Sequence, residues 1–170
     1  VTSGWVSAGT NTSISADLTL NETVTYYFSI RAVDNVNNVL RKITPLAVVS
    51  TYAGSGAASK VDGIGDDASF KSPTNIVIDR TDPNNNIIYV AEYGSSTIRR
   101  ITPSGDVGDV ETFAGTGSRG QVNANGTSAS FDRPYGMVLD AARNIYVAEY
   151  GNDVIRKITP NGDVSLYAGY

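Results

Sequence analysis

Hydrophobic and polar residues alternate over short stretches of this chain. The clearest alternation runs over 24–30, and similar apolar runs are separated by Gly, Asn, Asp, Ser and Pro. No long window repeats its apolar positions with the 3.6-residue period of an amphipathic helix. A period of two is typical of half-buried strands joined by turns, so the chain is predicted to be all-β.

The alternating segments recur in the same order along the chain. IIYVAEYG at 87–94 returns as NIYVAEYG at 144–151, and IRRITP at 98–103 returns as IRKITP at 155–160, in both cases 57 residues later. LRKITP at 40–45 is a partial third copy. Self-similarity at a fixed period is the signature of a repeat architecture.

Each unit is predicted to contain four strands. In the last copy they are expected near 135–140, 144–149, 153–159 and 163–168, with an Asn-Gly hairpin turn at 161–162. A four-stranded antiparallel meander cannot bury both faces alone, so neighbouring units must stack on it. Radial stacking of such sheets gives a partial β-propeller of about three blades, with repeat boundaries near 56 and 115.

One stretch departs from the 57-residue spacing. Phe70 and Asp79 return as Phe131 and Asp140, which are 61 residues further along. Turn-forming residues at 82–85 mark the place of the extra four residues. A lengthened hairpin loop is expected there.

The repeated segments resemble NHL repeats of β-propeller proteins. The resemblance covers about 38–170 and is carried by FDRPYGMVLD at 131–140, by the two motifs above and by the Gly- and Asp-rich stretch 53–70. It implies a propeller, and it implies no single activity, because function on this fold resides in particular sites.

The first 44 residues leave two interpretations open. TYYFSIRAVDN at 25–35 resembles a late strand of a fibronectin type III domain, with Trp5 and Leu18 in place of earlier strands. The alternative is a diverged first blade, in which Ile30 aligns with Ile88 and Asp34 with Glu92. The expected division is therefore 1–44 followed by propeller blades over 45–170.

About three units make only half of a ring of four to eight blades. The chain begins with Val, so we expect a processed chain or a fragment. Unfinished blade faces expose apolar side chains, which favours contact with another chain, by self-association or through the remainder of a larger protein.

Composition excludes several classes of function. Thirteen Lys and Arg against 17 Asp and Glu give a net charge of −4, which argues against nucleic-acid binding. The absence of Cys excludes disulfides, and the absence of His removes the usual base of a hydrolytic triad. No apolar run is long enough to insert into a membrane.

Two aspartates could form a metal site. Asp79 and Asp140 end the strands that would line the propeller channel, where carboxylates could bind Ca²⁺. The alternative is that each carboxylate caps its own turn. No other cofactor is expected.

Repeated tyrosines and arginines are the candidate contact residues. Tyr93 and Tyr150 follow the second strand of their units, and Arg99 and Arg156 lie on the third. Exposed Tyr and Arg contact proteins or glycans well. The alternative is that the arginines pair across strands with Glu92 and Glu149.

The long links between units contain further polar residues. Asp62, Asp66 and Asp67 cluster in the first link, whereas the second has Asn123, Asn125 and Ser128, so acidity is not part of the repeat. Sequons at Asn11, Asn21 and Asn125 would carry glycans in a secreted eukaryotic protein.

These observations favour a non-enzymatic module. We expect an extracellular or cell-surface binding or scaffold domain that contacts protein or glycan, or that serves as a structural subunit of a surface assembly. The placement rests on the fibronectin-like segment, few Lys and abundant Thr and Asn. The alternative is a Ca²⁺-dependent lactonase- or lyase-like enzyme with its site in the channel.

Overall fold

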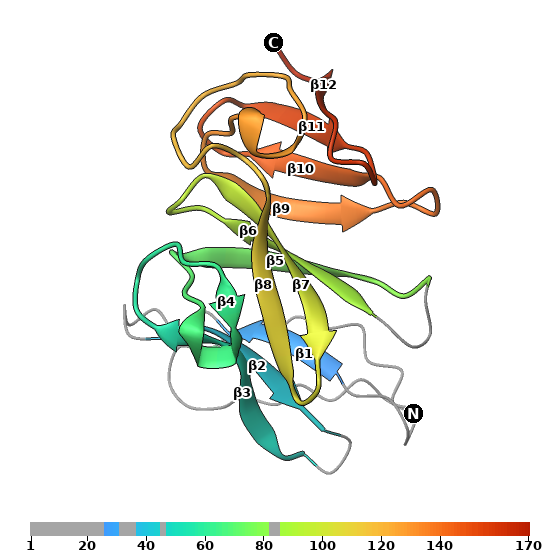
Figure 1. Ribbon diagram of the computed structural model, residues 1–170. Coiled ribbons are helices and arrows are strands. Elements are labelled where there is room, and N and C mark those ends of the chain that lie inside the picture. Colours follow the sequence, from blue (N-terminus) through green and yellow to red (C-terminus); the bar gives the residue numbers. More distant parts are fainter. Residues whose placement is uncertain (1–25, 31–36, 45–46, 82–85) are drawn as a thin grey trace.

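The protein is a partial β-propeller built from three antiparallel sheets. The computed structural model describes residues 26–30, 37–44, 47–81 and 86–170, the first of these ranges by its backbone only. The sheets lie one above the other, and the chain passes from the lowest sheet to the highest in Figure 1. Each sheet is called a blade below.

The third blade has the four strands that the repeat predicts. They are β9 (Pro134–Leu139), β10 (Ile145–Glu149), β11 (Val154–Ile158) and β12 (Val164–Ala168). They pair consecutively in the order β12-β11-β10-β9. Gly162 in the predicted Asn-Gly turn has a φ of 89°, which a residue with a side chain rarely adopts.

The second blade repeats this meander and gains a short edge strand. Its strands are β5 (Pro73–Asp79), β6 (Ile87–Glu92), β7 (Thr97–Ser104) and β8 (Val107–Ala114). β4 (Gly63–Ile64) belongs to the preceding link and pairs with β8, the outermost strand. The predicted insertion at 82–85 lies outside the described residues.

The first blade is described as three strands. They are β1 (Tyr26–Ile30), β2 (Asn38–Ile43) and β3 (Val49–Gly56), paired in that order. The expected boundary between 44 and 45 therefore falls inside a single sheet. Trp5, Leu18 and Asp34 lie outside the described residues.

The register of β1 corrects the predicted alignment of the first blade. Tyr26 pairs with Ile43, as Ile88 pairs with Ile101 in the second blade. Ile30 lies opposite Val39 and so occupies the place of a strand end, not the place of Ile88. The alignment was shifted by four residues because a period of two fits a strand equally well in either position.

The core lies between the blades. One apolar cluster joins the first and second blades around Leu40, Tyr52 and Ile88, and the other joins the second and third around Ile98, Met137 and Ile145. The second blade therefore packs one face against the first blade and the other against the third.

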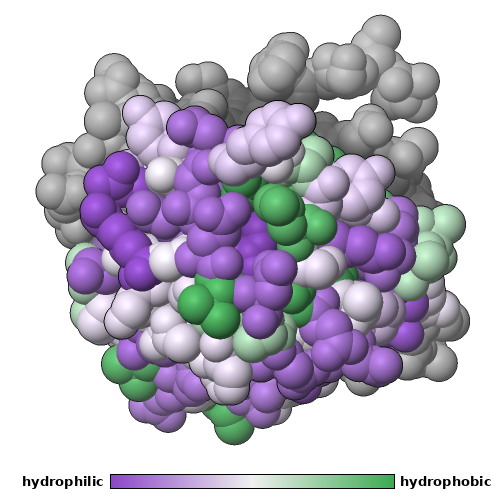
Figure 2. All heavy atoms as spheres, turned by 90° about the horizontal axis from the view of Figure 1, so that it is seen from above, coloured by the Kyte–Doolittle hydropathy of each residue, from purple (hydrophilic) through white to green (hydrophobic). Residues whose placement is uncertain are grey.

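The outer face of the third blade has no further blade packed on it among the described residues. Ala91 and Ile98 on the second blade are fully buried by the third blade. Their counterparts 57 residues on, Ala148 and Ile155, are exposed, as is Val138. Figure 2 looks onto this end of the molecule and shows apolar side chains among polar ones.

Two links connect the blades along one edge of the molecule. The first link, 57–72, contains the 3-10 turn η1 (Gly65–Asp67), and the second link, 115–133, contains η2 (Gly126–Ser128). The turns 93–96 and 150–153 lie on this edge, opposite the β9–β10 hairpin in Figure 1. These links and turns form the link-side face.

Among the described residues, no helix is long and apolar enough to cross a membrane.

Candidate functional site

A buried ion pair underlies the link-side face in the second blade. Glu92 ends β6, and Arg99 lies on the neighbouring strand β7. The Arg99 Nη1 atom is 3.2 Å from Glu92 Oε1, and both side chains are 0% exposed. Burying two charges away from solvent is costly unless most of their hydrogen-bonding atoms find partners; of the three guanidinium nitrogens of Arg99, Nε lacks one.

The first link supplies those partners. Arg99 donates from Nη1 to the Ser69 carbonyl and from Nη2 to the Val61 carbonyl and to Asp62 Oδ1, at 3.0, 2.9 and 2.6 Å. Its guanidinium also lies 5.4 Å from the centre of the Phe70 ring. The pair therefore fastens the link to the sheet.

The third blade repeats this arrangement. Arg156 pairs with Glu149 at 2.9 Å, and both side chains are again fully buried. Arg156 also donates to the carbonyls of Ser130 and Val122 and to Asn123 Oδ1. Asn123 stands where the first link has Asp62, so the repeated feature is a side-chain oxygen and not an acid.

The prediction that Arg99 and Arg156 are contact residues is wrong. Their guanidinium groups are covered by the strand and the link and are not exposed to a binding partner. The alternative, cross-strand pairing with glutamate, is confirmed. An alternating pattern places arginine on one face of a strand without telling whether a link covers that face.

The glutamates also hold the links in place. Glu92 accepts a hydrogen bond from the Lys71 backbone N–H at 2.9 Å, and Glu149 accepts one from Asp132 at 2.6 Å. Gly94 packs closely against Lys71, because a Cβ at Gly94 would lie 2.7 Å from Lys71 Cγ. The Tyr-Gly step in each repeat is therefore packed tightly against its link.

Three tyrosine rings meet on this rigid base. The ring centre of Tyr93 lies 6.4 Å from that of Tyr135 and 6.1 Å from that of Tyr150. Tyr135 and Tyr150 are 50% and 65% exposed, and Tyr93 is half-buried between them. Arg133 places its guanidinium 5.7 Å from the centre of the Tyr93 ring. Tyr93, Tyr135 and Tyr150 are called the tyrosine cluster.

A β-bulge directs Tyr135 to the cluster. Ala148 pairs with Gly136 and Glu149 with Pro134, so Tyr135 is the extra residue of β9. A bulge re-aims the side chain of its extra residue. Thr74, the counterpart in β5, donates its hydroxyl to the Tyr135 carbonyl at 2.9 Å and joins the two blades there.

Sequence analysis predicted two members of the cluster and missed the third. Tyr93 and Tyr150 were found because they recur, whereas Tyr135 stands where the second blade has Thr74. Arg133 was missed for the same reason, since its counterpart is Ser72. The signal available in the sequence was an aromatic residue, Tyr135, at a position where the other repeat has Thr74. Whether the cluster binds a ligand stays a prediction.

The Asp79 carboxylate is hydrogen-bonded at the edge of the molecule opposite the link-side face. Its Oδ1 accepts hydrogen bonds from the backbone and hydroxyl of Thr81, and its Oδ2 pairs with Arg143 Nε of the third blade at 2.5 Å. Burial alone would raise its pKa, but these hydrogen bonds and the Arg143 charge outweigh burial and lower it.

Asp140 is likewise used in its own hairpin. Asn144 donates to it from both its side chain and its backbone, and the Tyr146 hydroxyl donates at 3.2 Å. The Asn144 side chain is the main cause of the lowered pKa of Asp140. Burial and the Asp140 hydrogen bond raise the pKa of Tyr146.

The two aspartates therefore cap turns, as the alternative expected. Their carboxylates are already bound by their own hairpins, and no group of three His, Cys, Asp or Glu side chains suited to a metal ion occurs among the described residues. The geometry does not support Asp79 and Asp140 as Ca²⁺ ligands.

Of the three sequons, only Asn125 is described. Its Nδ2 donates to the Asn161 carbonyl and to Asp163 Oδ1, each at 2.9 Å. This is the nitrogen that a glycan would modify, and because modification removes one of its two hydrogens, it could not keep both bonds. Asn11 and Asn21 lie outside the described residues.

Solved structures share this fold at low sequence identity. Auxiliary nutrient binding proteins from Bacteroides ovatus and Bacteroides thetaiotaomicron match at 20% and 23% identity, with TM-scores of 0.65 and 0.62. Each match covers 84% of this chain and 35% of the neighbour. A Bacteroides thetaiotaomicron protein named as a candidate phosphatase matches at 19% identity and a TM-score of 0.63, over 85% of this chain and 33% of its own.

The chain thus spans about a third of the length of these neighbours. No protein-family model matches the chain, and no curated protein matches it. The likeness shows the fold alone.

Proposed function

We propose that the chain is a non-enzymatic binding module of NHL type, and that the tyrosine cluster is its contact surface for carbohydrate. The observation that carries the proposal is the meeting of three partly exposed tyrosine rings from two adjacent blades. Sugar rings present polarised C–H groups that pack on the electron-rich faces of aromatic rings, and the tyrosine hydroxyls can hydrogen-bond to sugar hydroxyls.

The rigid base of the cluster supports this function. The buried Glu–Arg pairs hold each link against its blade, and the link in turn holds the turn that bears the tyrosine. Rings that are already ordered lose little conformational entropy on binding. The names of two structural neighbours, which describe nutrient binding, agree with a binding role.

The outer face of the third blade supports a second interaction, with protein. Its exposed Val138, Ala148 and Ile155 repeat the positions that seal one blade to the next. Self-association, or contact with the rest of a larger chain, would cover this face as the third blade covers the second.

The enzymatic alternative has less support. A lactonase- or lyase-like site in the channel would need carboxylates free to meet on the axis. Asp79 is paired with Arg143 and Thr81, and Asp140 with Asn144. One neighbour has an enzyme's name, but a fold shared at 19% identity carries no activity with it.

Affinity electrophoresis tests the binding role. Native gels containing amylopectin, galactomannan or polygalacturonate should slow the wild-type chain in at least one case. Tyr150→Ala, at a 65% exposed position, should lose at least tenfold in affinity and keep its melting temperature. Tyr170→Ala, which changes an exposed tyrosine outside the cluster, is the matched control. Retardation in none of the gels, or equal retardation of Tyr150→Ala, contradicts the proposal.

A further inference from the structure

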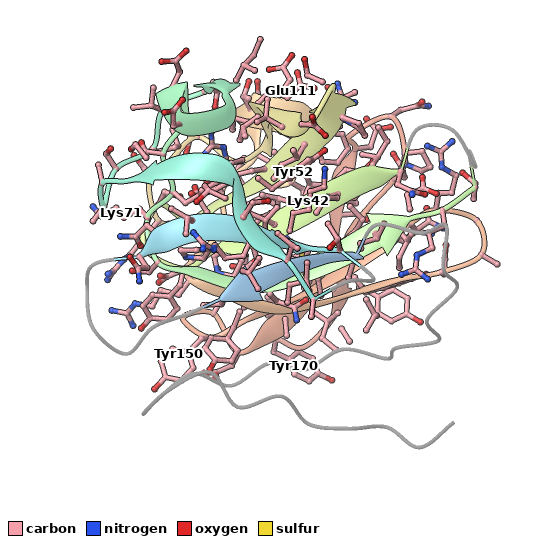
Figure 3. All side chains as sticks on the ribbon, turned by 90° about the horizontal axis from the view of Figure 1, so that it is seen from below. Lys42, Tyr52, Lys71, Glu111, Tyr150 and Tyr170 are labelled. Carbon is pink, nitrogen blue, oxygen red and sulfur yellow. The ribbon has the colours of Figure 1, made fainter. Side chains whose placement is uncertain are left out.

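The tyrosine cluster lies among positively charged side chains. Arg133 covers the Tyr93 ring, Lys71 is exposed and passes beside Gly94, and Arg119 has a side chain that is 61% exposed. In Figure 3, Lys71 and Tyr150 lie on the left side of the view. All three cations come from the links that frame the cluster.

Lys71, Arg119 and Arg133 carry three positive charges, against two negative charges on Asp132 and Asp153. Asp132 Oδ1 forms ion pairs with both arginines, at 3.5 Å from Arg119 Nε and 3.9 Å from Arg133 Nε, so one negative charge is shared by two positive ones. Asp153, on the turn after Tyr150, is exposed. Glu149 and Arg156 beneath the face neutralise each other.

A local excess of cations is unexpected in a chain with a net charge of −4. The field of the whole molecule repels anions, so any anion that binds here is held by local contacts and not by long-range attraction. Guanidinium groups suit carboxylate and sulfate, because their planar N–H groups match two oxygens at once.

We infer that the link-side face recognises an acidic polysaccharide. Tyrosine rings stack on the sugar, while Arg133, Arg119 and Lys71 bind its carboxylate or sulfate groups. This inference rests on the proposed carbohydrate binding and narrows it to the anionic class. It concerns recognition only and involves no covalent step.

Matched polysaccharides test the inference. Dextran and dextran sulfate share a backbone and differ only in sulfate, and polygalacturonate carries carboxylates without sulfate. Wild-type protein should bind polygalacturonate or dextran sulfate at least tenfold more tightly than dextran, and the preferred one identifies the anion. Affinity should fall when salt is raised.

Charge-removing variants locate the contact. Arg133→Gln and Lys71→Gln should each weaken binding of the acidic polymer about tenfold. Lys42→Gln is the control, since Lys42 is paired with Asp106 in another part of the chain. Melting temperatures of the three variants should agree within a few degrees.

The outcomes separate the two proposals. If dextran binds as tightly as the acidic polymers and Tyr150→Ala abolishes that binding, the anionic preference is wrong and the carbohydrate site stands. If Arg133→Gln and Lys42→Gln weaken binding equally, the anionic contact is also wrong. If no polymer binds, or Tyr150→Ala changes nothing, both proposals fail.

Discussion

The glutamate–arginine pairs show how one side chain can serve two parts of the chain. Glu149 neutralises Arg156 and also accepts a hydrogen bond from the backbone of the link at Asp132. Removing one partner of a buried pair leaves the other charge without compensation, which costs much more than the pair contributes. The pair is therefore a structural lock whose loss should be severe.

A matched pair of substitutions tests this lock. Glu149→Gln should lower the free energy of unfolding by about 3–5 kcal/mol, because Arg156 stays buried and unpaired. Glu111→Gln makes the same change in the exposed pair with Arg100, where about 0–1 kcal/mol is expected. Urea unfolding measures both. Equal effects would show that burial does not decide the outcome.

Asp79 should contribute to acid sensitivity. Its lowered pKa means that the folded state favours the carboxylate, so this stabilisation is present above the unfolded pKa of about 3.9 and is lost as pH falls through the lower folded value. Asp79→Asn should show a smaller loss of stability between pH 5 and pH 2 than the wild type. Urea midpoints across that range measure the difference, and parallel curves would contradict it.

The turn and link act together as the elements that present the tyrosines. Gly151 lies so close to Asp132 that a Cβ would overlap its carboxylate. The same Tyr-Gly step occurs in the second blade. Glycine is thus required here by close packing and not by its φ, which is not positive at Gly94 or Gly151.

Gly94→Ala should force the turn away from the link, because a Cβ there would lie 2.8 Å from the Lys71 carbonyl oxygen. We expect a loss of about 1–3 kcal/mol, as for overpacking in a tight site. Gly136→Ala is the control, because nothing lies within 4 Å of a Cβ there and its φ is not positive. Thermal unfolding compares the two. A stable Gly94→Ala protein would show that the turn and link are not packed as described.

The sequence could predict the strands but not which of their side chains the links would bury. The 57-residue repeat placed β9–β12 within one residue of their observed starts, because alternation and turn residues are local signals. The burial of Arg99 depends on the first link, which is distant in sequence. The direction of the Tyr135 side chain depends on a β-bulge, and the alternation of apolar and polar residues does not show where a strand register shifts.

In the part of the chain that the structure describes, blade stacking leaves an unfinished apolar face on the third blade. Ala114 is fully buried on the second blade, whereas Ala168, its counterpart, is exposed on the third. Large exposed apolar patches mark interaction surfaces in soluble proteins. This surface is expected to govern association of the chain.

Substitution of that face should reduce association without unfolding the chain. Val138→Ser combined with Ile155→Ser should lower the average mass in sedimentation equilibrium at high protein concentration. Val48→Ser is the control, as Val48 is exposed at 58% on the first blade. A wild-type chain that remains monomeric at every concentration would contradict self-association.

Backbone NMR of the 17.9 kDa chain during titration with polygalacturonate tests the location of the binding site most directly. The account predicts that amide shifts concentrate at 93–96, 132–135 and 150–153, with 79–81 and 140–144 unchanged. Shifts centred on Asp79 and Asp140 instead would contradict it and would favour a site in the channel.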